Sequence, residues 1–176
     1  MAAPQNLVTS RDVVAFLTEQ HEQLKTLMPE VLEGQGPVRL DRFARVRAVL
    51  AAHEALEQEA VHPRAEAEVG QDVVQARLNE ESAAEKALAD LEGLDIESDD
   101  FVTGYTKLCA DVVAHAEREE HEEFNKLSGD FTSVQLARIN AGAALAAGAL
   151  SGYGVEGESF AEMFNFAKTH IDAASQ

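Results

Sequence analysis

Two segments of the sequence carry a histidine and a glutamate four residues apart. HEALEQEA, residues 53–60, pairs His53 with Glu57, and HAEREEHEEF, residues 115–124, pairs His115 with Glu119. On an α-helix, side chains four residues apart lie on the same face about one turn apart, so each segment can direct two donor groups toward one point. Imidazole and carboxylate groups arranged in this way either stabilise a helix surface or bind a metal ion. Their positions within the helices decide between these two roles.

The elements that carry these segments are predicted to be helices. The chain has 176 residues, of which 45% are hydrophobic and only 6% aromatic. Alanine, leucine and glutamate are abundant, and this composition favours an all-α protein. The length fits a single compact domain with a buried core.

Capping and breaking residues predict where these helices begin and end. The first should begin near Thr9 or Ser10, where a hydroxyl precedes an acidic residue, and stop before GQGP. The second should end at His62-Pro63, because a proline disfavours helical geometry in the residue before it. The four predicted helices span roughly residues 10–33, 40–61, 71–92 and 100–127.

The C-terminal part is predicted to form two further helices. TSVQ, residues 132–135, resembles a capping box that opens an alanine-rich helix through about Leu150. SGYGVEGES, residues 151–159, is expected to be a flexible connector, and a last amphipathic helix should begin at Ser159. The apolar face of that helix is formed by Phe160, Met163, Phe164, Ala167 and Ile171.

These helices predict one architecture for the whole chain. We expect an antiparallel up-down four-helix bundle over residues 1–130. Residues 131–176 should form a helical extension that packs on the bundle or makes an oligomer contact.

Each of the first four predicted helices has an apolar stripe that steps by three and four residues, as the seam of a bundle requires. In all four helices, histidine or glutamate interrupts this stripe. The interrupting residues are His21; His53 and Glu57; Glu81 and Glu85; and His115, Glu119 and Glu122.

The interruptions lie at a common depth in the predicted bundle. At about 1.5 Å per residue, His21 lies roughly 20 Å before the first turn and His53 roughly 20 Å after it. His53 and Glu81 each lie about 15 Å from the second turn, and His115 reaches a similar depth. The sequence therefore predicts one layer of ionisable groups inside the bundle.

Such a layer needs compensation. Burying several ionisable groups without it costs several kcal/mol for each group, enough to cancel the stability of a typical domain. Metal ions provide it, since imidazoles and carboxylates on facing helices are the ligands of di-iron sites in bundles. Iron, manganese and zinc all accept these ligands. The alternative is an interaction bundle without a metal, in which His21 would be a core histidine with satisfied hydrogen bonds.

The remaining ionisable residues are predicted to lie elsewhere. At about 100° per residue, His62 lies about 180° around its helix from His53, and His121 lies about 120° from His115, so both are expected at the surface. His170 is expected to have a structural or surface role. The residues expected on a solvated face are Glu117, Glu120 and Glu123. The residues that could ligate or support the ligands are Glu54, Glu85 and Glu122.

Composition excludes several kinds of partner. The formal net charge of −18 works against binding to nucleic acid or to an anionic membrane. Cys109 is the single cysteine, so no internal disulfide can form, and we expect it to be an inert buried thiol, as we expect Tyr105 to be a core residue. The N-terminus lacks a signal-peptide pattern, and nowhere do 18 apolar residues stand together. We therefore expect a cytoplasmic protein, with a homo-oligomer left open.

The chain resembles the hemerythrin-like, or HHE cation-binding, family. The resemblance rests on His21, on His53 with Glu57 and on His115 with Glu119, and it covers about residues 8–128. AAHEALEQEAVHPR and VVAHAEREEHEEF resemble actinobacterial, including mycobacterial, members especially closely.

The resemblance implies a non-haem di-iron centre with oxo or hydroxo bridging. Glu57 and Glu119 would bridge the two irons, and His21, His53 and His115 would be terminal ligands. Oxygen-carrying hemerythrins also place an HxxxH pair on the third helix, which this chain lacks, and the helical stripe puts Glu81 at the first of those positions. Glu81 is therefore the expected sixth ligand.

A carboxylate in place of an imidazole has a chemical consequence. It should stabilise ferric over ferrous iron and lower the reduction potential, which disfavours reversible oxygen carriage. Together with the resemblance, this favours a protein that decomposes hydrogen peroxide, as a catalase does. The alternative is a protein that binds or senses iron, dioxygen or nitric oxide without turnover.

Overall fold

Helix α1, Ser10–Glu33, begins at the capping box that its sequence predicts. The Thr9 hydroxyl accepts a hydrogen bond from the backbone N–H of Asp12 at 3.1 Å, and the Asp12 carboxylate accepts one from the backbone N–H of Thr9 at 3.0 Å. These bonds satisfy backbone groups that the first turn of a helix leaves without partners. The helix ends at Gly34, so both predicted boundaries of the first helix are confirmed.

The computed structural model describes residues 7–150 and 158–174, and within these residues the chain is helical with no strand, which confirms the all-α class. The helices after α1 are α2, Pro37–Leu56; the π-helical turn η1, Glu57–Val61; α3, His62–Val69; α4, Gln71–Glu92; α5, Asp99–Glu122; the 3₁₀ turn η2, Phe124–Lys126; α6, Ser133–Leu150; and α7, Phe160–Ala173. No helix in the described ranges has the length and apolarity needed to span a bilayer.

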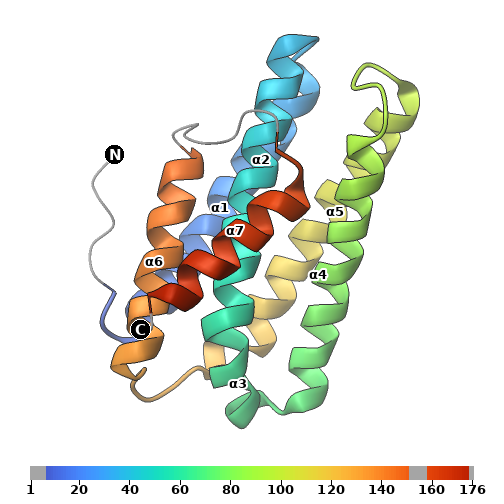
Figure 1. Ribbon diagram of the computed structural model, residues 1–176. Coiled ribbons are helices and arrows are strands. Elements are labelled where there is room, and N and C mark those ends of the chain that lie inside the picture. Colours follow the sequence, from blue (N-terminus) through green and yellow to red (C-terminus); the bar gives the residue numbers. More distant parts are fainter. Residues whose placement is uncertain (1–6, 151–157, 175–176) are drawn as a thin grey trace.

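Four long segments form the predicted antiparallel bundle. Helix α1 packs on α2 and α5, α4 packs on α5, and α3 connects the α2 segment to α4 (Figure 1). The chain turns back after each of these segments, so neighbouring helices run in opposite directions.

The second helix does not end at His62-Pro63, and that prediction is wrong. The backbone N–H of His62 bonds to the carbonyl of Glu57, five residues back, so η1 adds one residue to a turn and the helix continues into α3. Pro63 is the second residue of α3, directly after the wide turn, and it has no N–H to donate to the turn before it. The wide turn accommodates Pro63 within a continuous helical segment. It also changes the direction in which the side chains after it point, relative to a regular α-helix.

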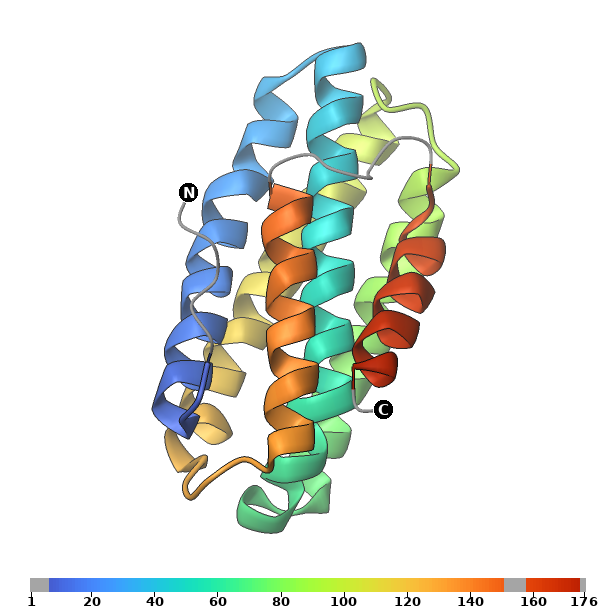
Figure 2. The same cartoon turned by 60° about the vertical axis from the view of Figure 1, so that its left-hand side comes forward.

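Helices α6 and α7 pack on the outside of α2 (Figures 1 and 2). Helix α6 runs alongside α2, whereas α7 crosses it and reaches α4. Because neighbours surround α2, every residue from 48 to 57 is buried. Ala-rich α6 approaches closely at Gly142, where an added Cβ would lie 2.7 Å from Cδ1 of Leu56.

The ends of these two helices follow their predicted caps. Thr132 and Gln135 form the expected capping pair at the start of α6, with bonds of 2.8 and 3.2 Å, and Ser159 caps α7 through Glu162. The predicted face of α7 is buried except for Phe164, which is half-buried. Most of the predicted connector, residues 151–157, lies outside the described residues.

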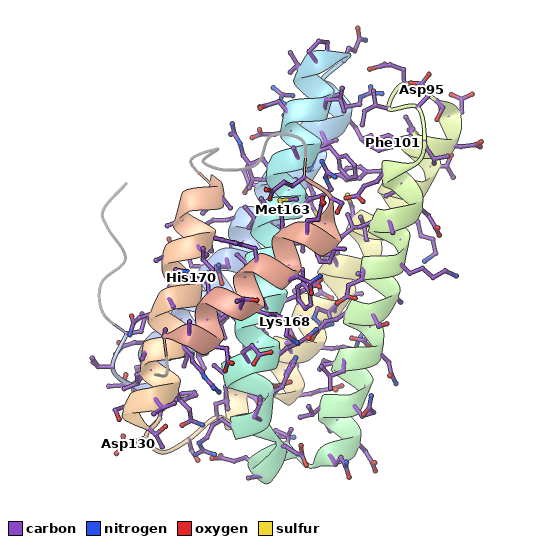
Figure 3. All side chains as sticks on the ribbon, in the orientation of Figure 1. Asp95, Phe101, Asp130, Met163, Lys168 and His170 are labelled. Carbon is purple, nitrogen blue, oxygen red and sulfur yellow. The ribbon has the colours of Figure 1, made fainter. Side chains whose placement is uncertain are left out.

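Two apolar clusters fill the bundle. One, near the α1–α2 turn, contains Phe101 (labelled in Figure 3), Phe43 and Tyr105 in mutual ring contact. The Tyr105 hydroxyl donates to the carbonyl of Met28 at 3.0 Å. This confirms Tyr105 as a core residue. The other cluster includes Leu17 and lies toward η1 and η2. The ionisable layer lies between the two clusters.

Candidate metal centre

The layer brings ligand atoms from several helices to within 4.8 Å of one another. One group contains His21, His53, Glu57 and Glu119, and a second contains Glu57, His62, Glu81 and Glu119. All of these residues are buried. The two groups share Glu57 and Glu119, so the two carboxylates stand between two adjacent sets of donors.

A hydrogen-bond partner at Nδ1 fixes the orientation of each histidine ring. The Nδ1 atoms of His21, His53, His62 and His115 lie 2.8, 3.0, 2.8 and 2.9 Å from an oxygen of Glu120, Gln20, Glu123 and Glu80, respectively. An Nδ1–H donated to each of these oxygens leaves Nε2 as the inward atom. Histidines that bind metals are held by a carboxylate or carbonyl partner in this way, because it fixes the tautomer with a lone pair toward the ion.

The inward atoms lack the partners that such burial requires. Both carboxylate oxygens of Glu57 and of Glu119, and Nε2 of His115, are buried without a hydrogen bond from any residue that the structure describes. The Nε2 atoms of His21 and His53 face each other at 3.1 Å. With Nδ1–H directed outward, two lone pairs meet there, and a cation between them would satisfy both. This donor set of imidazole nitrogens and carboxylate oxygens fits a first-row transition metal.

The pKa values of the carboxyl groups show how strongly the layer is perturbed. Burial and the adjacent carboxylate of Glu119 raise the pKa of Glu57 well above its usual value. Burial also opposes ionisation of Glu119, but His115 and His21, whose Nε2 atoms each lie 3.3 Å from one of its oxygens, outweigh it and lower the pKa of Glu119. Burial raises the pKa of Glu54, which lies beside the layer. Carboxylates packed this closely require positive charge to remain ionised together.

The pKa values of the histidines diverge. Burial, with His21 nearby, lowers the pKa of His53 well below its usual value, which favours the neutral form that binds metals. Burial also opposes protonation of His62, but its hydrogen bonds to Glu123 and Glu81 prevail and raise its pKa to about 10. Burial opposes protonation of His115 as well, but the negative charge of Glu119 is the main effect that outweighs it, and the pKa of His115 is raised to about 9.

His62 and Glu123 correct two predictions from the sequence. His62 was expected at the surface, but it is 2% exposed, and its Nε2 lies 2.6 Å from Oε1 of Glu81. The rotation of about 100° per residue does not hold across η1, where a π turn takes more residues. Glu123 was expected on the solvated face, but it is 0% exposed. Its position four residues after Glu119 was a signal for the inward face.

The other predicted residues occupy varied positions. His115 borders the shared carboxylates, with Nε2 3.3 Å from Oε1 of Glu119. Glu54 is buried and Glu85 is half-buried, whereas the side chain of Glu122 is 49% exposed and pairs with Arg77, so its predicted inward position is wrong. Glu117, His121 and His170 are exposed, Glu120 is half-buried, and Cys109 is half-buried with a pKa raised by burial.

The C-terminal extension also reaches this layer. Nε2 of Gln58 donates to Oε2 of Glu81 at 2.6 Å, and Lys168 of α7 lies 3.4 Å from Oε1 of Gln58 and 3.0 Å from Oε1 of Glu59 (Figure 3). A chain of polar contacts thus runs from α7 through η1 to Glu81. The side chain of Glu81 is held from one side by His62 and from the other by Gln58.

Comparison with known proteins gives one match. The family described as "Hemerythrin HHE cation binding domain" matches residues 12–127, which includes every residue of the two donor groups and excludes α6 and α7. No curated protein and no solved structure matches the chain. The particular closeness to actinobacterial members stays a prediction, as does the role of each residue as a ligand.

Proposed function

Because the chain belongs to the hemerythrin HHE cation binding domain family, we propose that its helical bundle holds two iron ions and decomposes hydrogen peroxide. The observation that carries this proposal is the pair of donor groups that share Glu57 and Glu119. Each of these two carboxylates would help to hold both ions, and among the described residues none of their four oxygens accepts a hydrogen bond.

We assign the remaining donors by their groups. His21 and His53 belong with the shared carboxylates at one position, and His62 and Glu81 at the other. His115 borders Glu119 and adds a further nitrogen, so the proposal keeps all six residues expected from the sequence and adds His62.

The proposed reaction converts two molecules of hydrogen peroxide into two of water and one of dioxygen. Bound iron would supply Lewis acidity and exchangeable electrons. The chain supplies position and protons: Gln20, Glu80 and Glu120 hold histidine rings in place, and Glu54, whose pKa is raised by burial, can hold a proton at its carboxyl group beside the layer. A reducing cytosol is the compartment we propose, because the chain has a single cysteine.

Oxygen release from hydrogen peroxide tests the function. We expect iron-loaded protein to release dioxygen and His53→Ala to do so at least about tenfold more slowly, because loss of groups that hold a metal reduces affinity and activity by about that factor or more. Metal content is measured on the same samples. Equal rates for the two proteins, or no release with a full iron complement, would refute the peroxide reaction. Spectral change with dioxygen or nitric oxide in that second case would support binding without turnover.

A further inference from the structure

The histidines of the donor layer differ in the charge of the group that holds them. Three carboxylates lie 2.8, 2.8 and 2.9 Å from a histidine Nδ1, and they belong to Glu120 at His21, Glu123 at His62 and Glu80 at His115. His53 is different, because its Nδ1 lies 3.0 Å from the amide oxygen of Gln20. In the part of the chain that the structure describes, His53 is thus the one histidine of the layer with an uncharged partner.

Packing alone does not account for Gln20. This residue lies on α1 directly before His21 and is 1% exposed. Its Nε2 is buried without a hydrogen-bond partner among the described residues. An unpaired buried donor destabilises a folded chain, and an apolar side chain of similar shape would avoid this cost. The contact that explains a glutamine at this position is therefore the one between its oxygen and His53.

The charge of the partner changes the histidine as a metal ligand. A carboxylate that accepts the Nδ1–H bond increases the electron density that Nε2 offers to a metal ion. Hydrogen bonds to ionised groups are stronger than bonds between neutral groups, so an amide oxygen has a smaller effect. A carboxylate also adds a negative charge near the ion. Because ferric iron carries more positive charge than ferrous iron, this added charge stabilises the ferric form and lowers the reduction potential.

The proposed peroxide reaction depends on this potential. One molecule of hydrogen peroxide gives up two electrons and two protons and becomes dioxygen. The other takes up these electrons and protons and becomes two molecules of water. The centre must therefore accept electrons in one half of the cycle and return them in the other. The carboxylate of Glu81 favours the ferric form, and a second carboxylate in place of Gln20 would shift the balance further in that direction.

We propose that Gln20 is a positioning residue that holds His53 with an uncharged acceptor and thereby keeps the reduction potential of the iron centre higher than a carboxylate at this position would. This inference rests on the proposed function and adds to it a residue of α1 that sets how readily the centre is reduced. Gln20 acts through His53, so its replacement changes the potential and leaves the set of ligands intact.

The reduction potential of iron-loaded protein tests the proposal. Gln20→Glu keeps nearly the same shape and adds one negative charge. We expect this variant to favour the ferric form at least about tenfold, the lower range for groups that hold metal-binding histidines. For one electron, that change lowers the potential by about 59 mV. Spectroelectrochemical titration measures it, and a Gln20→Glu protein with the potential of the wild type would overturn the proposal.

The reverse change at His21 provides a second variant. Glu120→Gln replaces a charged partner at Nδ1 by an uncharged one, and the side chain of Glu120 is 25% exposed, so the change places no new charge inside the bundle. We expect its potential to rise by a similar amount. This variant decides the matter if Gln20→Glu does not fold. A potential that falls or stays the same in Glu120→Gln would contradict the role given to these partners.

Gln75 provides the matched control. It is exposed on α4, and its amide donates to Oδ1 of Asn79 at 3.1 Å. Gln75→Glu adds the same charge as Gln20→Glu, but solvent and salt screen a charge at the surface. We expect the potential of this variant to equal that of the wild type. A shift as large as that of Gln20→Glu would show that net charge is the cause, and the contact with His53 would lose its role.

Zinc uptake by the same variants shows whether the donor layer is assembled. Zinc accepts the same ligands as iron and takes no part in redox chemistry. We expect all three variants to bind zinc, so that a shift in potential does not reflect a lost ligand. A chain that holds iron at a potential independent of Gln20 refutes this inference and leaves the metal centre standing. A chain that takes up neither metal refutes the centre, and the role of Gln20 falls with it.

Discussion

At the scale of single residues, His62 gives a sharp test of the metal centre. Its Nε2 points to Glu81, and its Nδ1 is held by Glu123, so the ring is positioned like those of His21 and His53. We expect His62→Gln to weaken zinc binding at least about tenfold, the lower range for loss of a group that supports a metal site. Binding is measured by equilibrium dialysis and mass spectrometry.

His121 is the matched control, since it is exposed and its Nδ1 contacts only the carbonyl of Glu117 among the described residues. His121→Gln should bind zinc as the wild type does. If the two variants retain the same amount of metal, His62 has a structural role and lies outside the centre.

The raised pKa values of His62 and His115 predict a pH dependence. Their pKa values are about 10 and about 9, so in the metal-free protein at neutral pH both rings are in the positively charged imidazolium form. A metal ion binds neutral imidazole and must displace these protons, so affinity rises with pH until the pKa is passed. We expect zinc affinity to increase at least about tenfold per pH unit between pH 6 and 8, which corresponds to one displaced proton.

Competition with a chelator of known affinity measures this dependence at each pH. His62→Gln removes one of the competing protons and should flatten the slope. An affinity that does not change with pH would contradict the protonation states given above.

The positions of the candidate residues could be predicted from the sequence where the helices are regular. His21, His53 and Glu119 come together because a constant rotation per residue describes α1, α2 and α5. The same rule misplaced His62, because the rotation changes across η1, and a π turn has no simple sequence pattern. Proline alone was not a sufficient signal, since Pro29 lies inside α1, which has no such turn.

At the scale of elements, the helix ends follow from local chemistry. The hydroxyl caps at Thr9, Thr132 and Ser159 were predictable because each is followed three residues later by an acidic or amide side chain that returns the hydrogen bond. The packing of α6 and α7 on α2 was not predictable in this way. This packing depends on which helix of the bundle is apolar around its whole circumference. The apolar stripe of α2, which steps by three and four residues, identifies only the face that points into the bundle.

Gly142 tests the contact between α6 and α2. A Cβ at this position would lie 2.7 and 3.0 Å from Cδ1 and Cβ of Leu56, which is fully buried, whereas a Cβ at Gly148 of the same helix would meet nothing within 4 Å. Both changes to alanine improve helix propensity equally. We therefore expect Gly142→Ala to have a free energy of unfolding about 1–3 kcal/mol lower than that of Gly148→Ala, the usual cost of overpacking.

Urea unfolding of the two variants measures this difference. Gly148→Ala should itself be more stable than the wild type by about 0.5–1 kcal/mol. Equal stability of the two variants would mean that α6 does not pack closely on Leu56.

At the scale of the whole molecule, the bundle consists of two apolar clusters separated by a polar layer. The buried carboxylates of this layer are Glu54, Glu57, Glu81, Glu119 and Glu123. The depth of this layer was predictable from the sequence. In an antiparallel bundle, the number of residues between a side chain and the nearest turn gives its distance from the end of the bundle. The sharing of Glu57 and Glu119 between two donor groups was expected from the family resemblance. Helix periodicity alone does not give it, because it depends on the directions of individual side chains.

Removal of the metal should therefore lower the stability of the entire bundle. An ion that binds only the folded chain stabilises it by about 4 kcal/mol when its concentration is about a thousand times Kd. For a chain of 176 residues, this corresponds to a rise in melting temperature of roughly 8–16 °C. We expect a chelator to lower the melting temperature of the loaded protein by that amount, measured by circular dichroism, and added zinc to restore it. His53→Ala should respond much less to the same chelator, because its donor layer is incomplete. A wild-type melting temperature that does not change on chelation would mean that the buried carboxylates are tolerated without a cation, and that the layer is a feature of an interaction bundle.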